Sequence, residues 1–221
     1  MRSDVEIHDR GRGNTIEIGP IHPFKLRITI LGNNNTVRIG PMGVRRQFAI
    51  TIRHSNSYLE IGEGCLLQGV IGIAQGATVI IGREVTAQQI AITAQEGRRI
   101  TIGDRCMFGR NVHIRNSDAH PIFDVATRQQ INPAADTHIG DHVWGAHSTT
   151  FLKGSRIGMN SVVGTHATVS AGEYPDGALL VGSPANVVRT GIIWDRWFGD
   201  SLDDPALSGY LAEYIPETAE G

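Results

Sequence analysis

This chain of 221 residues has few cysteines, no large excess of one charge and no long apolar runs. The two cysteines, Cys65 and Cys106, are too few for a disulfide framework and form no Cys-x-x-Cys pair, so we expect both to be buried and reduced. Lys and Arg total 20 against 22 Asp and Glu, a formal net charge of −2. This balance argues against nucleic acid as a partner.

Targeting signals are also missing from the sequence. Residues 1–6 lack the apolar stretch of a signal peptide, and no uninterrupted apolar run approaches the roughly 18 residues that span a membrane. We therefore expect a cytoplasmic protein that does not partner a membrane.

Glycine, in contrast, is abundant, with 27 of 221 residues, against an average usage of roughly 7%. From Ile139 onward the sequence repeats with a period of six. Side chains alternate along a strand, so two positions of each repeat point inward. These positions are Ile139, Gly145, Phe151, Ile157, Val163 and Val169, with smaller partners at Val143, Thr149, Ser155, Ser161 and Ala167. Three such strands close one coil, which predicts an all-β fold, a left-handed parallel β-helix of the hexapeptide-repeat kind.

The same signal extends upstream with a longer step. Ile-Gly pairs at residues 18, 39, 61, 81 and 102 are separated by 21, 22, 20 and 21 residues, so each coil should carry about three extra residues. A β-sandwich is the competing fold, but sandwich strands keep no six-residue register. Gly145 occupies an inward site usually filled by an aliphatic residue, and we expect a cavity or a shifted strand there.

The repeat stops between Ile114 and Ile139. Residues 117–136 include Pro121 and Pro133 and follow no hexapeptide rule, which predicts a loop extruded from one corner. Loops this long in a compact domain are usually functional or disordered. We divide the chain into a β-helix domain, residues 1–189, and a C-terminal extension, residues 190–221. Apolar residues at helical spacing predict a short amphipathic helix over 204–215, covering the open coil end or packing on a neighbour.

The extruded loop carries a candidate general base. His120 has a suitable pKa range, and Asp118 or Asp124 could hold one ring nitrogen and fix the tautomer. The alternative is a solvent-exposed or carbonyl-capped imidazole without a catalytic role.

Three motifs between about Ile102 and Arg189 resemble the hexapeptide-repeat O-acetyltransferases, closest in pattern to bacterial capsule-modifying, polysialic acid and galactoside O-acetyltransferases. They are His120-Pro121 with a following Asp124, the block Ile139–Trp144, and Gly182–Ala185 leading to Arg189. In that family the catalytic histidine lies 24 residues before the tryptophan, as His120 does before Trp144.

The resemblance implies direct transfer of an acetyl group from acetyl-CoA to a hydroxyl of a sugar or bacterial surface polysaccharide, with His120 as base and no metal. Trp144 would contact the cosubstrate or donate its indole N–H, or else pack at a subunit interface. Residues implied for CoA binding are Trp144, His147, Lys153, Thr165, Ser170 and Arg189. The family also implies a homotrimer with intersubunit sites. His120 and Trp144 leave the coil at different corners, so one site could use two chains.

Three alternatives remain open at this point. A γ-class carbonic anhydrase shares the fold and binds zinc through histidines, but His142 and His147 occupy the fourth and third positions of their hexapeptides rather than the third and second. A non-enzymatic β-helix scaffold would make His120 and Trp144 incidental. An amino acceptor such as serine is also conceivable, although the serine acetyltransferases have a largely helical amino-terminal domain that residues 1–100 do not resemble.

Overall fold

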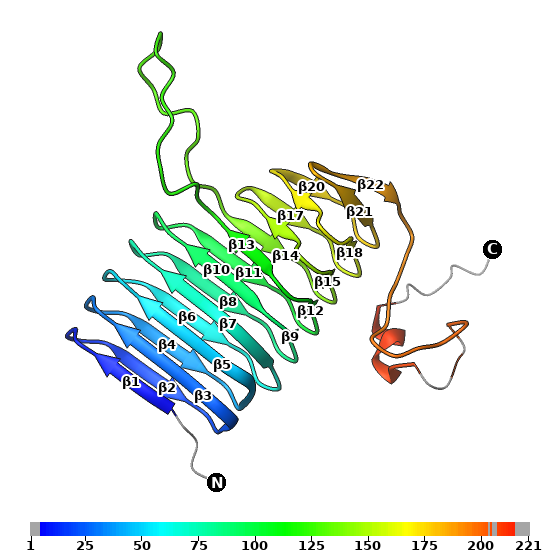
Figure 1. Ribbon diagram of the computed structural model, residues 1–221, viewed down its shortest axis with the longest axis horizontal. Helices are drawn as coiled ribbons and strands as arrows, with labels where there is room; N and C mark the ends of the chain where they lie inside the picture. The colour runs from blue at the N-terminus through cyan, green and yellow to red at the C-terminus, as the bar shows by residue number, and fades with distance from the viewer. Residues whose placement is uncertain (1–4, 203, 205–206, 215–221) are drawn as a thin grey trace.

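A computed structural model describes residues 5–202, 204 and 207–214, and within them the chain winds into a parallel β-helix (Figure 1). One side of the coil, here called face 1, is an eight-stranded parallel sheet. Its strands, in order, are β2 (Thr15–Ile18), β4 (Thr36–Ile39), β6 (Tyr58–Ile61), β8 (Thr78–Ile81), β11 (Arg99–Ile102), β14 (Thr137–Ile139), β17 (Ser155–Ile157) and β20 (Gly172–Tyr174).

The rest of the coil changes shape along its length. It begins with long strands, β1 (Val5–Asp9), β3 (Ile21–Ile30), β5 (Met42–Ile52) and β7 (Leu66–Ile73). Strand β7 pairs with both β9 and β10, and from there two faces replace one. Face 2 contains β9 (Thr86–Ala87), β12 (Met107–Phe108), β15 (Trp144–Gly145), β18 (Val162–Val163) and β21 (Leu179–Gly182). Face 3 contains β10 (Ile90–Ala94), β13 (Val112–Arg115), β16 (Thr150–Phe151) and β19 (Thr168–Val169).

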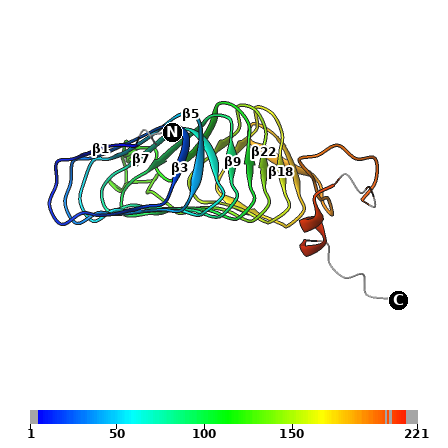
Figure 2. The ribbon, with the colours of Figure 1, turned by 90° about the horizontal axis from the view of Figure 1, so that it is seen from below.

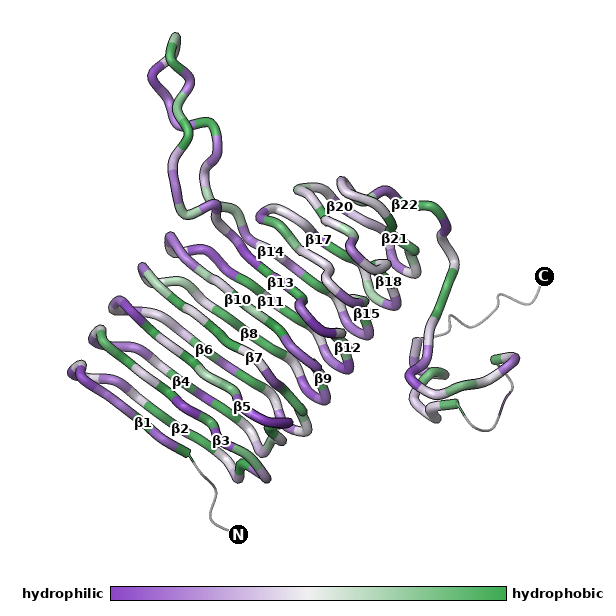
Figure 3. The backbone as a smooth tube through the Cα atoms, viewed as in Figure 1, coloured by the Kyte–Doolittle hydropathy of each residue, from purple (hydrophilic) through white to green (hydrophobic). Residues whose placement is uncertain are grey.

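The inward positions expected from the six-residue period are all buried. From Ile139 to Val169 they lie inside the coil, in line with neighbours from the coils above and below. Figure 3 shows hydrophobic residues recurring along the strands, while hydrophilic residues gather at many of the turns. The left-handed β-helix fold is therefore confirmed, and burial of the apolar side chains inside the coil favours it.

Gly145 does not leave the expected cavity or shift its strand. Strand β15 keeps its register, with Gly145 beside Phe108 of the preceding coil. A Cβ atom on Gly145 would lie only 2.9 Å from Cδ1 of Phe108, whose ring packs edge-on against Phe151. The expectation was wrong because a large side chain one coil away fills the space that the glycine leaves.

The extra residues and the extruded loop share one corner, between faces 3 and 1. Strand β10 runs on to Ala94 before β11 begins at Arg99, which lengthens the early coils. Between β13, which ends at Arg115, and β14, which begins at Thr137, the chain projects as the long loop in Figure 1. The extruded loop is thus confirmed, and it grows from a corner that is already enlarged in the preceding coils.

Both cysteines are free and buried, as expected. Burial raises the pKa of the Cys65 thiol to about 11 and that of the Cys106 thiol to about 12. Neither thiol forms the thiolate that a cysteine nucleophile needs at neutral pH.

The parallel ladder ends in an antiparallel pair, β21 with β22 (Ala185–Arg189). The segment that follows is drawn in orange and red to the right of the coils in Figure 2. The helix expected over 204–215 is shorter, a 3-10 helix at Gly209–Glu213, with residues 205, 206 and 215 outside the described part. Ser208 does not cap it, because its hydroxyl bonds to Asp195. The described part of this segment packs on the coil's own corner, not over its end. No described helix has the length and apolar character needed to cross a membrane.

Candidate active site

The base of the extruded loop is tied to the coil beneath it. The buried Asn116 accepts a hydrogen bond from the Gln95 backbone N–H through its side-chain oxygen, at 2.9 Å, and another from the Ala135 N–H through its carbonyl, at 3.0 Å. Ser117 bonds the Glu96 carboxylate and accepts a bond from the Ala119 N–H. Both ends of the loop are therefore fixed where they leave the prism.

Lys153 braces the same loop from the next coil. Its Nζ donates to Oδ2 of Asp118 at 2.5 Å and to the Asn132 carbonyl at 2.8 Å. Asn132 Nδ2 in turn donates to Asp118 and to the carbonyl of His120. Lys153 and Asn132 hold the pKa of Asp118 below its usual value. In one chain, Lys153 and Asp118 thus fix the path of the loop beside His120.

The His120 ring itself is exposed and receives no hydrogen bond from the described residues. Asp118 is engaged by Lys153, and Asp124 accepts from the backbone N–H and hydroxyl of Thr127 at 2.6 and 3.0 Å. Neither carboxylate orients the imidazole in a single chain. The position leaves the ring open to a group brought from elsewhere.

A groove of about 370 Å³ runs along face 2 and its corner with face 3. Trp144, half-buried and facing outward from β15, lines it together with His147 and Thr165. These are three of the six residues expected to bind CoA, so the structure brings half of that set together. The other three lie elsewhere: Lys153 at the loop corner, Ser170 bonded through its carbonyl to the Tyr174 hydroxyl, and Arg189 exposed on β22.

Two arginines in this groove, Arg45 and Arg110, are not among the residues expected from the sequence. Arg110 lies 37 residues before His147, the same offset that separates Met107 from its strand partner Trp144. Aligning the coils on either side of the loop would have found it. Arg45 comes from a bulge in the long strand β5 and had no periodic signal. No Asp or Glu among the described residues lines the groove, so its charge suits an anionic group.

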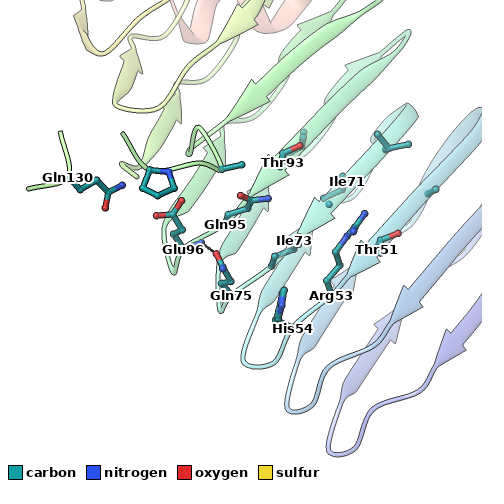
Figure 4. A pocket seen from close by; sticks show the side chains of 17 residues that line it. Thr51, Arg53, His54, Ile71, Ile73, Gln75, Thr93, Gln95, Glu96 and Gln130 are labelled. Atoms are coloured by element: carbon teal, nitrogen blue, oxygen red, sulfur yellow. Dashed lines mark hydrogen bonds between the residues drawn. The ribbon is translucent and has the colours of Figure 1, made fainter. Parts of the chain in front are cut away.

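A larger hollow of about 910 Å³ lies between the loop and the long strands (Figure 4). Ala119 and Pro121, on either side of His120, line it with Gln130 of the loop. The strand side supplies Thr51, Arg53, His54, Thr93, Gln95 and Glu96. Hydroxyl, amide and charged groups of this kind can hydrogen-bond a hydrophilic ligand such as a sugar.

The two hollows share no lining residue. His120 neighbours the larger one, and Trp144 lines the smaller one. The placement agrees with the expectation that the two residues leave the coil at different corners and need not meet within one chain.

The histidines considered for zinc have separate surroundings. His142 is fully buried and stacked on Trp194, whereas His147 is exposed and meets the ring of His166 edge-on at 5.7 Å. The part of the chain that the structure describes holds no group of three or more His, Cys, Asp or Glu side chains suited to a metal ion. The arrangement offers no support for the carbonic anhydrase alternative.

The buried His142 leads us to expect a fold that weakens in mild acid. Burial lowers the pKa of His142 below its ordinary value, so the folded protein keeps this ring neutral while the unfolded chain protonates it below about pH 6.5. The contribution of the neutral ring to the free energy of unfolding should be complete above that pH and fall as the pH drops through the acidic range below it. Melting temperatures of wild type and His142→Asn across this range test the point. The variant should decline less steeply; parallel curves would show that His142 does not contribute. His138, whose pKa burial also lowers, is present in both proteins.

Comparison with known proteins covers nearly the whole chain. It is 32% identical over 206 residues to a polysialic acid O-acetyltransferase of Neisseria meningitidis, covering 91% of this chain and 96% of the relative. It is 32% identical over 158 residues to a polysialic acid O-acetyltransferase of Escherichia coli O1:K1, covering 71% of this chain and 51% of the relative. The crystal structure of the polySia-specific acetyltransferase NeuO superposes with a TM-score of 0.88 at 31% identity, over 96% of this chain and 99% of that one. No protein-family profile matches the chain.

Proposed function

The chain belongs to the hexapeptide-repeat O-acetyltransferases, and from that membership we propose that it transfers the acetyl group of acetyl-CoA to a hydroxyl of a sugar or bacterial surface polysaccharide. Relatives named as polysialic acid O-acetyltransferases support a carbohydrate acceptor. The polar hollow beside His120 is consistent with such an acceptor, because its lining offers both donors and acceptors to hydroxyl groups.

Acetyl-CoA fits the groove that Trp144 lines. The indole presents an aromatic surface, and Arg45 and Arg110 supply positive charge and hydrogen-bond donors for phosphate groups, with no carboxylate among the described lining residues. His147 adds an imidazole that can hydrogen-bond. Thr165 adds a hydroxyl at the corner of the next coil. We assign cosubstrate binding to this groove. Lys153, Ser170 and Arg189 do not line it, so the assignment does not depend on them.

The reaction is a direct transfer. The His120 imidazole takes the proton of the acceptor hydroxyl, and the oxygen attacks the thioester carbonyl of acetyl-CoA. Hydrogen-bond donors, among them the Trp144 indole N–H, stabilise the negative charge on the carbonyl oxygen. The C–S bond then breaks, and the CoA sulfur receives the proton from the imidazolium. The products are an O-acetyl ester and free CoA.

The observation that carries the proposal is that His120 and Trp144 lie at two separate hollows of one chain. The same chain resembles an O-acetyltransferase over nearly its full length. A second copy would supply the missing half of each site. We therefore propose a homotrimer in which the loop of one subunit faces the groove of its neighbour, since flat prism faces pack well about a threefold axis. In this arrangement the exposed apolar loop residues would become buried; they are Ile122, Phe123, Val125 and Ile131.

Saturating CoA is expected to stabilise the protein against heat. A ligand at about 100 times its Kd adds about 2.7 kcal/mol to the free energy of unfolding, which corresponds to a rise in Tm of roughly 5 to 10 °C for a chain of this size. Thermal melting with and without CoA measures it. Trp144→Ala should show a smaller rise. An unchanged Tm in the wild type at saturating CoA would favour a scaffold without a cosubstrate site.

A further inference from the structure

The C-terminal segment docks on one corner of the coil through an aromatic stack. This corner, between faces 1 and 2, is a column of residues with left-handed backbone, one from each successive coil: Glu84, Arg105, His142 and Asn160, with φ of 57°, 56°, 52° and 60°. Their side chains point away from the apolar core, so the column offers polar and aromatic groups to a covering segment. Trp194, Tyr210 and Tyr214 occupy that position.

Trp194 is held in the segment by burial, stacking and a hydrogen bond. Its side chain is buried, its ring stacks on His142 with centroids 4.3 Å apart and planes 8° apart, and its Nε1 donates to the His142 carbonyl at 2.7 Å. A hydrogen bond and a parallel stack to one residue fix both the place and the tilt of the indole.

The partner of that stack is itself immobilised. His142 lies between Trp194 and Tyr214, whose ring is 4.8 Å away and nearly parallel, and its Nδ1 is 3.0 Å from Oδ1 of Asn160. Arg105 lies over the ring of Tyr210 and pairs with Glu84 one coil back. The segment is therefore bound across several coils, which makes it a rigid support.

Trp194 also touches Trp144. The two indole centroids are 5.9 Å apart with the planes tilted by 43°. Trp144 lines the face 2 groove, and Trp194 does not. The ring of Trp144 thus has the groove on one side and the docked segment against another. A tryptophan facing outward from a two-residue strand would otherwise have several rotamers open to it.

We propose that Trp194 is a positioning residue that holds the Trp144 ring in the orientation needed to bind acetyl-CoA. The inference rests on the proposed function, in which Trp144 contacts the cosubstrate. Without Trp194, the Trp144 ring leaves its productive orientation in part of the molecules. Only the molecules that keep this orientation bind CoA, so the apparent Kd for CoA rises. One aromatic pair accounts for about a three- to tenfold change in an equilibrium.

The test is a double-mutant cycle on the Kd for CoA, measured by calorimetry with Trp144→Ala, Trp194→Ala and the double variant. Trp194→Ala should raise Kd about three- to tenfold, and the same change in the Trp144→Ala background should have almost no further effect. Trp194→Phe, which keeps a ring beside Trp144, should restore most of the affinity. Trp197→Ala is the matched control, because this tryptophan three residues on is 62% exposed and has no ring contact among the described residues.

The outcomes separate the two proposals. If Trp144→Ala leaves Kd unchanged, the assignment of the groove to CoA fails. If Trp144→Ala weakens binding but Trp194→Ala does not, or if the two effects simply add, Trp194 does not position Trp144. Should Trp194→Ala melt below the assay temperature, the cycle is run with Trp194→Phe, where a smaller coupling of the same sign is expected and additivity again overturns the inference.

Discussion

Replacing His120 with alanine should lower turnover by ~10²–10⁴-fold, the range that a positioned general base contributes. The Kd for CoA should stay within about twofold of the wild-type value, because the proposed role of His120 is to take a proton from the acceptor hydroxyl, and no loop residue of the same chain lines the groove. Steady-state release of CoA in the presence of a carbohydrate acceptor measures the first quantity, and calorimetry measures the second. The loop should keep its path, since its anchors at Asn116 and Lys153 do not involve the His120 ring.

A matched control is His113→Ala. His113 is also an exposed histidine, on strand β13 at the start of the loop, and its Nε2 lies 3.1 Å from Oδ1 of Asn111. Its removal should leave turnover unchanged. Equal activity of wild type and His120→Ala would exclude His120 as the base, whereas a matching loss in both variants would indicate a general effect on folding.

Mixing two inactive variants should restore activity. If each site takes His120 from one subunit and Trp144 from the next, oligomers formed from equal amounts of His120→Ala and Trp144→Ala chains contain some sites with both residues intact. Random assembly makes roughly a quarter of all sites complete, and an isolated mixed trimer has about one complete site in three. Co-expression of the two variants with different affinity tags, followed by isolation of mixed oligomers, allows their activity to be compared with that of each variant alone.

The same experiment has a clear opposite outcome. A site built within one chain would lack a residue in every subunit of the mixture, so activity would stay at the level of the separate variants. That result would rule out the intersubunit arrangement. The chemical role of His120 would still be tested by the His120→Ala variant alone. Oligomers that contain only His120→Ala chains, half of them with each tag, provide the baseline activity.

The repeat could be predicted from the sequence because its cause is local. Alternation along a strand decides which side chain faces inward, and a six-residue period therefore specifies the buried set from Ile139 to Val169 without knowledge of any distant contact. The extruded loop followed for the same reason, as the place where the period fails. Sequence motifs locate His120 and Trp144. The order of the corners along the coil predicts that the two residues lie apart within one chain.

Contacts between coils could not be predicted in the same way. Phe108 fills the space at Gly145 from 37 residues away, and Trp194 docks on His142 from 52 residues away. The first pair shares the 37-residue offset of aligned coils, but that offset does not say that the Phe108 ring turns into the space beside Gly145. The second pair has no periodic signature, because it depends on where the returning segment comes to lie. Lys153 is implied for CoA binding by the family resemblance, yet in the single chain it pairs with the Asp118 carboxylate. Long flexible side chains of this kind are placed by tertiary contacts.

The most direct test of acetyl transfer to a carbohydrate hydroxyl is the fate of the acetyl group. Purified protein is incubated with acetyl-CoA and a panel of sugars and bacterial surface polysaccharides, and each acceptor is then examined by NMR for an ester that mild base removes. We predict such an ester on at least one carbohydrate, formed in step with CoA release and nearly absent with His120→Ala. CoA release without an ester on any acceptor, or an acetyl group that survives mild base as an amide, would contradict this account.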